Sequence, residues 1–366
     1  MAFLRILYAV SLGTVLTAAG CTASSSPEQP AAADSNVVMT DAATEDSVPL
    51  QEFTTTLIAE GLDTPAGLAV QAGSGDAFVS TAQGIIRLDA ADEYSAHPEI
   101  TGFDEDAYGK GPSYRFGPLG LCFLNDTTLV VGGGGLLDGE DVVQFFEVGA
   151  VPLAEPVSAG SARYRVGPIP QGEYSHRGEG NYFALQVHNG AIYVTSHGDD
   201  TKGWISKVTF DGPTPVTLQP VIAAKTATGV DGPSGLAVLP NNKLLVSQTG
   251  ELHERPDSLL SVFDPVSGEL EQKMETGLYD ITAILIHPTT GTIYALDFAW
   301  AVPEEGGLYS LEVNDDRGQI VATKHASLLH PTAMAVTTDG DLIVTCVEDQ
   351  DEQTDARGKV YRVALR

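Results

Sequence analysis

The run GPSGLAV at residues 232–238, followed after a short turn by LLVSQT at 244–249, decides the fold of this chain. The first run starts its apolar stretch at a small residue, Gly235. Residues 240–242, Pro-Asn-Asn, are of the types that tight turns prefer. Two short apolar runs joined by such a turn predict a β-hairpin.

Five further copies of this pattern occur along the chain. Successive copies are 53, 64, 51, 48 and 50 residues apart, measured between their small anchor residues. The six anchors are Gly67, Gly120, Ala184, Gly235, Ala283 and Ala333. Self-similarity at a period of about fifty residues indicates a repeat architecture.

Each copy is followed by a third β-prone run, such as LLSVFD at 259–264. Six repeats of three or four strands predict an all-β six-bladed β-propeller, in which small anchors let the inner strands crowd around a narrow axis. The last repeat ends on its third run, at 359–365, and the free strand candidate upstream of the first anchor is 53–59. We therefore expect this N-terminal strand to close the last blade, which leaves only short, protected edges.

The N-terminus, MAFLRILYAVSLGTVLTAAGC, is typical of an export signal. Arg5 precedes an apolar stretch at 6–19, which is too short to span a bilayer as a helix and suits a signal peptide. The small residues before Cys21 resemble the lipobox of bacterial lipoproteins, although Ala18 stands where Leu is commoner. The resemblance implies a signal peptide at 1–20 and a lipid on the thiol of Cys21. An ordinary signal peptide with an accidental cysteine is the alternative.

Residues 22–50 are rich in Ser, Ala, Pro, Thr and acids and show no apolar periodicity. Such a composition predicts a disordered tether. The expected organisation is a lipidated cysteine and tether at 21–50 and a propeller at 51–366. The protein is then expected in a bacterial cell envelope, periplasmic or on the cell surface, held at the membrane through its lipid anchor only.

The chain is strongly acidic, with a formal charge of −30. Taking away Arg5 and the five acids of residues 22–50 leaves −26 on the body. Such a surface repels phosphate backbones, so nucleic acid is excluded as a partner, whereas cations and basic partners are favoured. The plainer interpretation is a solvated surface.

The repeat pattern resembles that of the NHL-repeat and gluconolactonase-like (TolB-like) six-bladed propellers, over residues 53–366. This superfamily contains enzymes as well as binding modules. The resemblance places the lactonase metal ligands directly before the anchors. Here those positions hold Ala66, Leu119, Phe183, Ser234, Thr282 and Thr332. None is a carboxylate or carboxamide, so the family's metal site is not carried over.

A second set of polar residues lies three or four positions before the anchors. Equal offsets in a ring bring side chains toward its axis, and converging oxygen ligands suit calcium. The candidate metal ligands are Asp63, Asn181, Asp231, Asp280 and His330. The alternative is that these residues only make turns at the starts of strands.

Long polar loops, which connect second to third strands, are expected on one face of the propeller around the channel mouth. One of them follows IYVTSHG at 192–198, which resembles a segment of quinone-dependent sugar dehydrogenases. Their polyanionic cofactor needs clustered Arg or Lys, and these loops are mostly acidic. The candidate ligand rim is Arg115, His197, Asp199, Glu251, His253, Asp297 and Trp300.

These observations favour a propeller that binds a protein, peptide or small-molecule ligand, with a cationic ligand favoured by the charge. The first alternative is a divalent-cation-dependent hydrolase, lactonase- or esterase-like, with its site at the channel mouth. The second is a quinoprotein sugar dehydrogenase. Fold alone does not choose among them, and whether the protein is an enzyme stays open at this stage.

Overall fold

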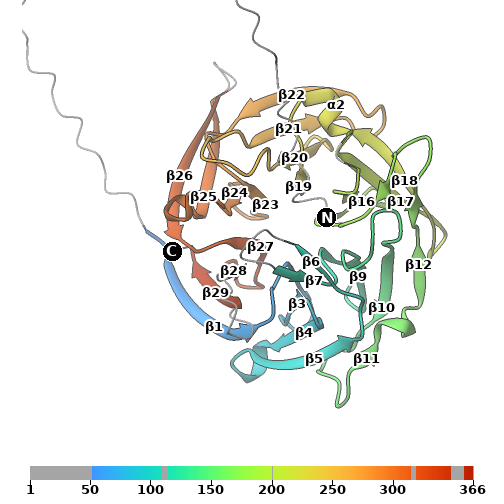
Figure 1. The fold of residues 1–366 in the computed structure, drawn as a ribbon. Coiled ribbons are helices and arrows are strands. Elements are labelled where there is room, and N and C mark those ends of the chain that lie inside the picture. The colour runs from blue at the N-terminus through green and yellow to red at the C-terminus, as the bar shows by residue number, and fades with distance from the viewer. Residues whose placement is uncertain (1–51, 109–113, 200, 315–318, 348–357, 366) are drawn as a thin grey trace, which may run out of the picture.

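The computed structural model describes residues 52–108, 114–199, 201–314, 319–347 and 358–365. Six antiparallel sheets stand around a central axis, as Figure 1 shows, and this confirms the predicted six-bladed β-propeller. The predicted signal peptide, Cys21 and the tether lie outside the described residues.

Blades one to three run outward from their innermost strands. They consist of β2 (Gly67–Val70), β3 (Ala77–Thr81), β4 (Gly84–Asp89) and β5 (Ser95–Thr101); β8 (Leu121–Asn125), β9 (Thr128–Gly132), β10 (Val143–Glu147) and β12 (Tyr164–Val166); and β15 (Leu185–His188), β16 (Ala191–Thr195), β17 (Trp204–Asp211) and β18 (Thr214–Ala223).

Blades four to six follow the same order. They consist of β19 (Pro233–Val238), β20 (Leu244–Gln248), β21 (Leu259–Phe263) and β22 (Leu270–Glu275); β23 (Ile281–Ile286), β24 (Ile293–Asp297), β25 (Gly307–Asn314) and β26 (Gln319–Ser327); and β27 (Pro331–Val336), β28 (Leu342–Cys346), β29 (Gly358–Ala364) and β1 (Thr54–Leu62).

The remaining elements lie in connections between blades or strands. They are the hairpin of β6 (Asp106–Tyr108) and β7 (Tyr114–Phe116), β11 (Val157–Ser158), the pair β13 (Ile169–Pro170) and β14 (Gly178–Glu179), the helix α2 (Ala224–Thr228), and the 3-10 turns η1 (Ala90–Asp92), η2 (Ala159–Ser161) and η3 (Pro303–Glu305). None of the helices in the described ranges is long and apolar enough to cross a membrane.

The ring is closed by the N-terminal strand, as predicted. β1 pairs antiparallel with β29, from Thr54 opposite Ala364 to Leu62 opposite Gly358. β1 ends at Leu62, three residues beyond the predicted end at residue 59. Its pairing with β29 contains two register irregularities. Just before it, the Phe53 ring stacks on His325 of β26 at 4.3 Å, so the closing segment also contacts blade five.

The anchor residues are small because the inner strands nearly touch. A Cβ atom on Gly67 would lie 1.9 Å from the carbonyl oxygen of Leu119, and one on Gly120 would lie 2.3 Å from that of Phe183. Any side chain there would force two blades apart. The glycines of blades one and two are therefore required by the close approach of neighbouring strands.

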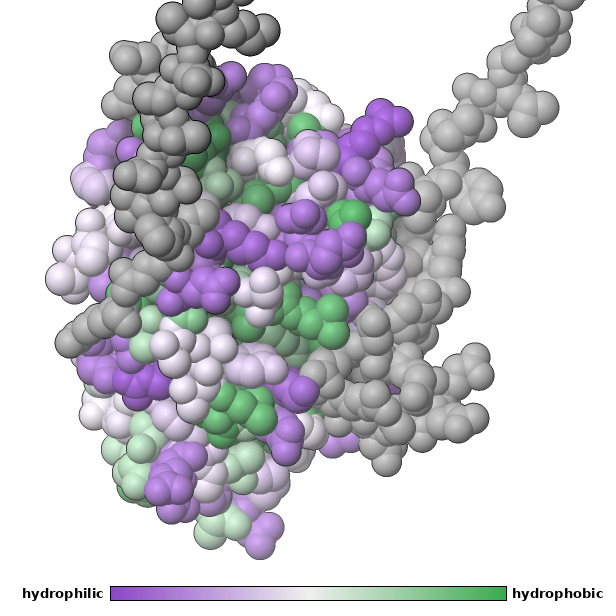
Figure 2. All heavy atoms as spheres, turned by 90° about the vertical axis from the view of Figure 1, so that its left-hand side faces the viewer, coloured by the Kyte–Doolittle hydropathy of each residue, from purple (hydrophilic) through white to green (hydrophobic). Residues whose placement is uncertain are grey.

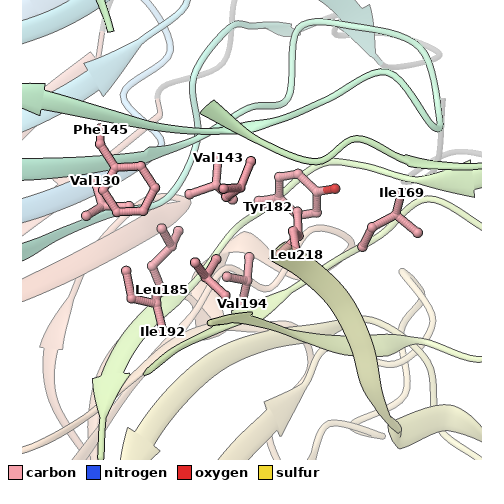
Figure 3. Packing of buried hydrophobic residues seen from close by; sticks show 11 residues of the cluster. Val130, Val143, Phe145, Ile169, Tyr182, Leu185, Ile192, Val194 and Leu218 are labelled. Carbon is pink, nitrogen blue, oxygen red and sulfur yellow. The ribbon is translucent and has the colours of Figure 1, made fainter. Parts of the chain in front are cut away.

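The hydrophobic core lies between blades. Figure 3 shows the cluster between blades two and three, in which Phe145 and Val130 of one blade face Leu185 and Ile192 of the other. Similar clusters lie at the other blade interfaces. Because each blade buries its faces against its neighbours, the blades stabilise one another.

Figure 2 views the molecule from the side on which the outer strands of blades five and six lie in Figure 1. Hydrophilic residues cover most of this side, and the apolar patches between them are small and separate. Soluble proteins commonly show scattered apolar residues of this kind. The coloured part of this side therefore shows no broad apolar surface.

Candidate functional site

The two faces of the propeller differ in their connections. On the turn face, short turns join first to second strands. On the opposite loop face lie the longer connections at 133–142, 249–258 and 298–306. Between the faces runs the channel, a cavity of about 440 Å³ lined by the inner strands of the blades. We call its opening on the loop face the channel mouth.

Hydroxyl groups bind neighbouring blades together just inside this mouth. Ser234 Oγ donates to the carbonyl oxygen of Ile281 at 2.5 Å, and Thr282 Oγ1 donates to that of Pro331 at 2.8 Å. Thr332 Oγ1 donates to the carbonyl of Pro65 at 2.7 Å. In blades four to six, the positions that resemblance assigned to metal ligands therefore hold hydrogen bonds from each blade to the next.

His197 serves the same purpose in blade three. Phe183, the residue before that blade's anchor, has no side-chain donor. Instead, His197 Nε2 lies 2.7 Å from the carbonyl oxygen of Pro233, the first residue of blade four's inner strand. Burial lowers the pKa of His197, which favours the neutral ring with its Nε2–H donated to that carbonyl. This predicted rim residue thus links blades three and four.

Two of the predicted metal ligands form ion pairs. Asp63 contacts Arg115, which comes from β7, and Asp231 contacts Lys225 of α2. Both aspartates are buried, while the two cations are partly exposed. Each pair therefore neutralises a carboxylate that would otherwise be available to a cation.

Asn181 and His330 have left-handed backbone, at φ of +52° and +43°, and lie four residues before β15 and directly before β27 respectively. Asn181 Nδ2 lies 3.4 Å from the carbonyl of His197, and the ring of His330 stacks on Phe298. Across the described ranges, no three His, Cys, Asp or Glu side chains are grouped so that they could hold a metal ion. The calcium site therefore stays a prediction.

Asp280 differs from the other four. Its side chain is buried, with the residue only 1% exposed. Oδ2 accepts the backbone N–H of Trp300 at 2.6 Å, whereas Oδ1 has no hydrogen-bond partner among the described residues. Burial raises the pKa of Asp280 to about 8, and the nearby carboxylates of Asp297 and Asp257 contribute to the rise.

The carboxylate of the neighbouring Asp297 is hydrogen-bonded by backbone N–H groups. Its carboxylate accepts the N–H groups of Tyr279, Asp280 and Ala299 at 2.9, 2.7 and 3.2 Å. These bonds hold the start of β23 beside the end of β24. Asp297, a predicted rim residue, therefore shapes the turn that carries Trp300.

Four rings at the mouth form what we call the aromatic wall: Tyr114, Phe298, Trp300 and His330. The Phe298 ring lies nearly parallel to His330 at 4.5 Å and to Trp300 at 5.9 Å. Tyr114 meets Trp300 edge-on at 5.6 Å. Tyr114 belongs to the β6–β7 hairpin between blades one and two, which lies over the mouth in Figure 1, whereas Trp300 belongs to blade five. The wall thus joins opposite parts of the ring.

The other predicted rim residues lie on two loops. Asp199 accepts backbone N–H groups from His176 and Thr201. In blade four, the His253 ring lies 3.5 Å from Asp257, and the Glu251 N–H donates to the same carboxylate. These residues surround the mouth, but their hydrogen bonds mainly hold the loops.

Sequence analysis did not single out Asp141. This residue is buried, and its Oδ2 accepts the N–H of Asn181 from the next blade at 2.9 Å. Burial raises its pKa to about 7, as it does for Glu179 nearby. The glycine run at 132–135 before Asp141 was the available signal, because glycines there let the loop approach neighbouring backbone.

Comparisons with known proteins identify the fold of this chain but not its activity. No protein-family model and no curated protein sequence matches the chain. Among solved structures, the PQQ-bound aldose sugar dehydrogenase of Streptomyces coelicolor is 18% identical, with a TM-score of 0.55, covering 86% of this chain and 99% of its own. The apo soluble aldose sugar dehydrogenase of Escherichia coli is 12% identical, with a TM-score of 0.56, covering 86% and 100%.

A gluconolactonase-like protein is 14% identical, with a TM-score of 0.55, and the match covers 86% of this chain and 93% of that one. The resemblance predicted from the repeats is therefore confirmed for the propeller architecture. At identities this low, the likeness shows the fold alone.

Proposed function

We propose that this protein is a non-enzymatic propeller that binds a small ligand or peptide at the channel mouth and is displayed from a bacterial membrane by lipid on Cys21. One observation carries the proposal. The polar groups best placed for chemistry hold blades and loops together, whereas the half-buried rings of Phe298 and Trp300 line the mouth. Ring faces of this kind suit binding by stacking.

The two enzymatic alternatives receive less support from the geometry. A hydrolase needs a metal with an open coordination position and a general base, and the described residues offer no group of three metal-ligating side chains. A dehydrogenase would have to bind a polyanionic quinone, yet Arg115 and Lys225 at the mouth are each engaged by a carboxylate. Sugars remain worth testing as ligands, because aldose sugar dehydrogenases share the fold.

Two tryptophans allow a direct binding test. Trp300 lies at the mouth, whereas Trp204 in blade three is buried and donates its Nε1–H to the carbonyl of Tyr174. The variant Trp204→Phe therefore reports on the mouth alone, and Trp300→Phe is the matched control. We expect a ligand among sugars, short peptides and small amines to change the fluorescence of the first variant and raise its melting temperature.

The same set should leave Trp300→Phe unchanged in fluorescence. Glucose oxidation in the presence of the quinone and calcium, or hydrolysis of gluconolactone, would contradict a purely binding function if either were abolished by Asp280→Asn. The absence of any response in Trp204→Phe, across all three classes of ligand, would remove the support for a mouth site.

Anchoring is tested separately. Several acyl chains together hold a protein stably at a membrane, whereas one does so only marginally. Cys21→Ser should therefore release the protein from the membrane fraction or block its processing. Unchanged partitioning of this variant into detergent would contradict the lipoprotein assignment without affecting the binding site.

A further inference from the structure

We infer that the ligand of the channel mouth carries an ammonium group, which is bound between the carboxylate of Asp280 and the aromatic wall. This inference rests on the proposed binding function and specifies the chemical class of its ligand. The carboxylate of Asp280 is buried, and no positively charged side chain of the described residues forms an ion pair with it.

Three of the other buried acids have a cation close by, although no cation is among the groups that act on Asp141 and Glu179. Asp63 contacts Arg115, Asp231 contacts Lys225, and Asp76 contacts Arg87. The charged groups that act on Asp280 are the carboxylates of Asp297 and Asp257, which have the same sign. Burying a carboxylate is costly unless it is paired and hydrogen-bonded. Oδ1 of Asp280 has no hydrogen bond among the described residues and is closed to solvent, so the ligand cation would reach this oxygen only when the side chains that cover it shift.

The turn that carries two rings of the aromatic wall is hydrogen-bonded to this carboxylate. The backbone N–H of Trp300 donates to Asp280 Oδ2, so the ring and the carboxylate are held by the same turn. Tyr114 is inclined to Trp300 by 75°, while Phe298 is inclined to Trp300 by only 13°. The rings therefore present two planes at a steep angle. Aromatic faces carry partial negative charge and attract organic cations within about 6 Å.

An ammonium group fits these residues better than a metal ion does. Calcium takes about six to eight oxygen ligands, and no three metal-ligating side chains are grouped in the described parts of the chain. A quaternary ammonium needs no hydrogen-bond acceptor. One carboxylate and several ring faces suffice for it. The charge of −26 on the body adds long-range attraction for any cation.

The test uses choline and its neutral isostere 3,3-dimethylbutan-1-ol, which has the same shape without the charge. Both are titrated calorimetrically into the full protein at one ionic strength and at pH 8.5, because the pKa of Asp280 is about 8. We expect choline to bind at least about tenfold more tightly than the isostere. A tenfold difference corresponds to about 1.4 kcal/mol.

Two variants locate the site. Asp280→Asn should weaken choline binding about tenfold or more and leave any binding of the isostere unchanged. Asp339→Asn removes a carboxylate on the turn face, where Asp339 is exposed and contacts Arg362. This control should bind choline as the wild type does, which separates a specific site from general attraction to an acidic surface. Melting curves confirm that both variants are folded.

The inference is overturned if choline does not bind, if the isostere binds equally well, or if Asp280→Asn has no more effect than Asp339→Asn. A sugar or peptide that binds at Trp300 when choline does not would overturn the ammonium inference and leave the binding function standing. If nothing binds at Trp300, both fail.

Discussion

Two buried carboxyl sites at opposite faces of the propeller are built in different ways. In blade one, near the turn face, Arg87 is fully buried and lies 2.5 Å from Asp76 and 3.6 Å from Glu99. In blade five, at the channel mouth, Asp280 is equally buried, accepts the backbone N–H of Trp300, and lies near the like charges of Asp297 and Asp257. The comparison indicates that Asp76 is neutralised by a cation of its own blade, whereas the carboxylate of Asp280 is left for the proposed ligand.

The surroundings of Arg87 explain its structural role. Its Nη1 donates to the carbonyl of Gly149 at 3.1 Å, and Gln71 Nε2 donates to the same oxygen at 3.1 Å. Gly149 starts a segment from blade two that crosses to blade one, where β11 pairs in parallel with β5. The ion network on the turn face therefore helps to hold two blades together. Asp280 has no comparable contact.

Both faces depend on a closed ring, so closure has the largest expected effect. Removing residues 22–50 should leave the melting temperature nearly unchanged, because their composition predicts a tether that packs against nothing. Removing residues 22–61 deletes almost all of β1 and exposes the edge of β29. We expect a fall of more than about 10 °C by calorimetry. Equal melting temperatures for the two truncations would show that β1 is not required.

The next effect concerns the cation of blade one. Arg87→Met leaves Asp76 and Glu99 buried without a positive charge, which should cost about 3–5 kcal/mol, measured by urea unfolding. Arg163→Met is the matched control, because Arg163 pairs with Glu147 where both side chains are about half-exposed. The control should unfold like the wild type. If Arg87→Met did so too, the structural role assigned to this network would be wrong.

The pH dependence of stability should separate the two sites further. The pKa of Asp280 is about 8 in the folded protein and about 4 when exposed. Protonation therefore favours folding. The stability from this group is full below about pH 4 and is lost as the pH rises to about 8, at up to about 1.4 kcal/mol per pH unit.

Urea unfolding of the wild type and of Asp280→Asn at pH 5, 6, 7 and 8 checks this through the difference between their free energies of unfolding. The stability of Asp280→Asn should rise relative to wild type across the range, because Asn has no proton to lose. Other carboxyl groups with a raised pKa, such as Asp141 and Glu179, are present in both proteins, so their contributions cancel in this difference. A constant difference would mean that Asp280 titrates near its ordinary value.

The smallest effect is expected from the hydrogen bonds between blades at the mouth. Thr282→Val keeps the shape of the side chain but removes the hydroxyl that donates to Pro331. The cost should be about 1 kcal/mol, measured by urea unfolding. Thr289→Val, at an exposed turn position, is the control. An equal loss in both variants would show that the hydroxyl of Thr282 does not link the blades.

The blades could be predicted because each repeat carries its own local signals: a small anchor, an apolar run and a turn. The same signals located the closing strand, since one β-prone segment was left over. The content of the long spacing of 64 residues between Gly120 and Ala184 could not be predicted. This spacing contains β11, which joins blade one, and β12, which is only three residues long.

The candidate site was harder to predict because its contacts are long-range. Equal offsets correctly placed Asp63 and Asp231 before inner strands, but nothing in the sequence indicated that Asp63 would meet Arg115, which is 52 residues away. Trp300 was predicted as a rim residue, but its contact with Tyr114 was not. Tyr114 and Trp300 are far apart in sequence and meet only because the β6–β7 hairpin reaches across the mouth.

The central claim is that the fold requires Asp76 but does not require Asp280. The most direct test is urea unfolding of Asp76→Asn and Asp280→Asn side by side at pH 7. Asp76→Asn should lose about 3–5 kcal/mol, because Arg87 is left buried without its main partner. Asp280→Asn should be as stable as wild type or more so, because Asn can still accept the N–H of Trp300 and carries no charge. A loss in Asp280→Asn as large as that in Asp76→Asn would show that Asp280 is a structural residue and would contradict its assignment to a ligand.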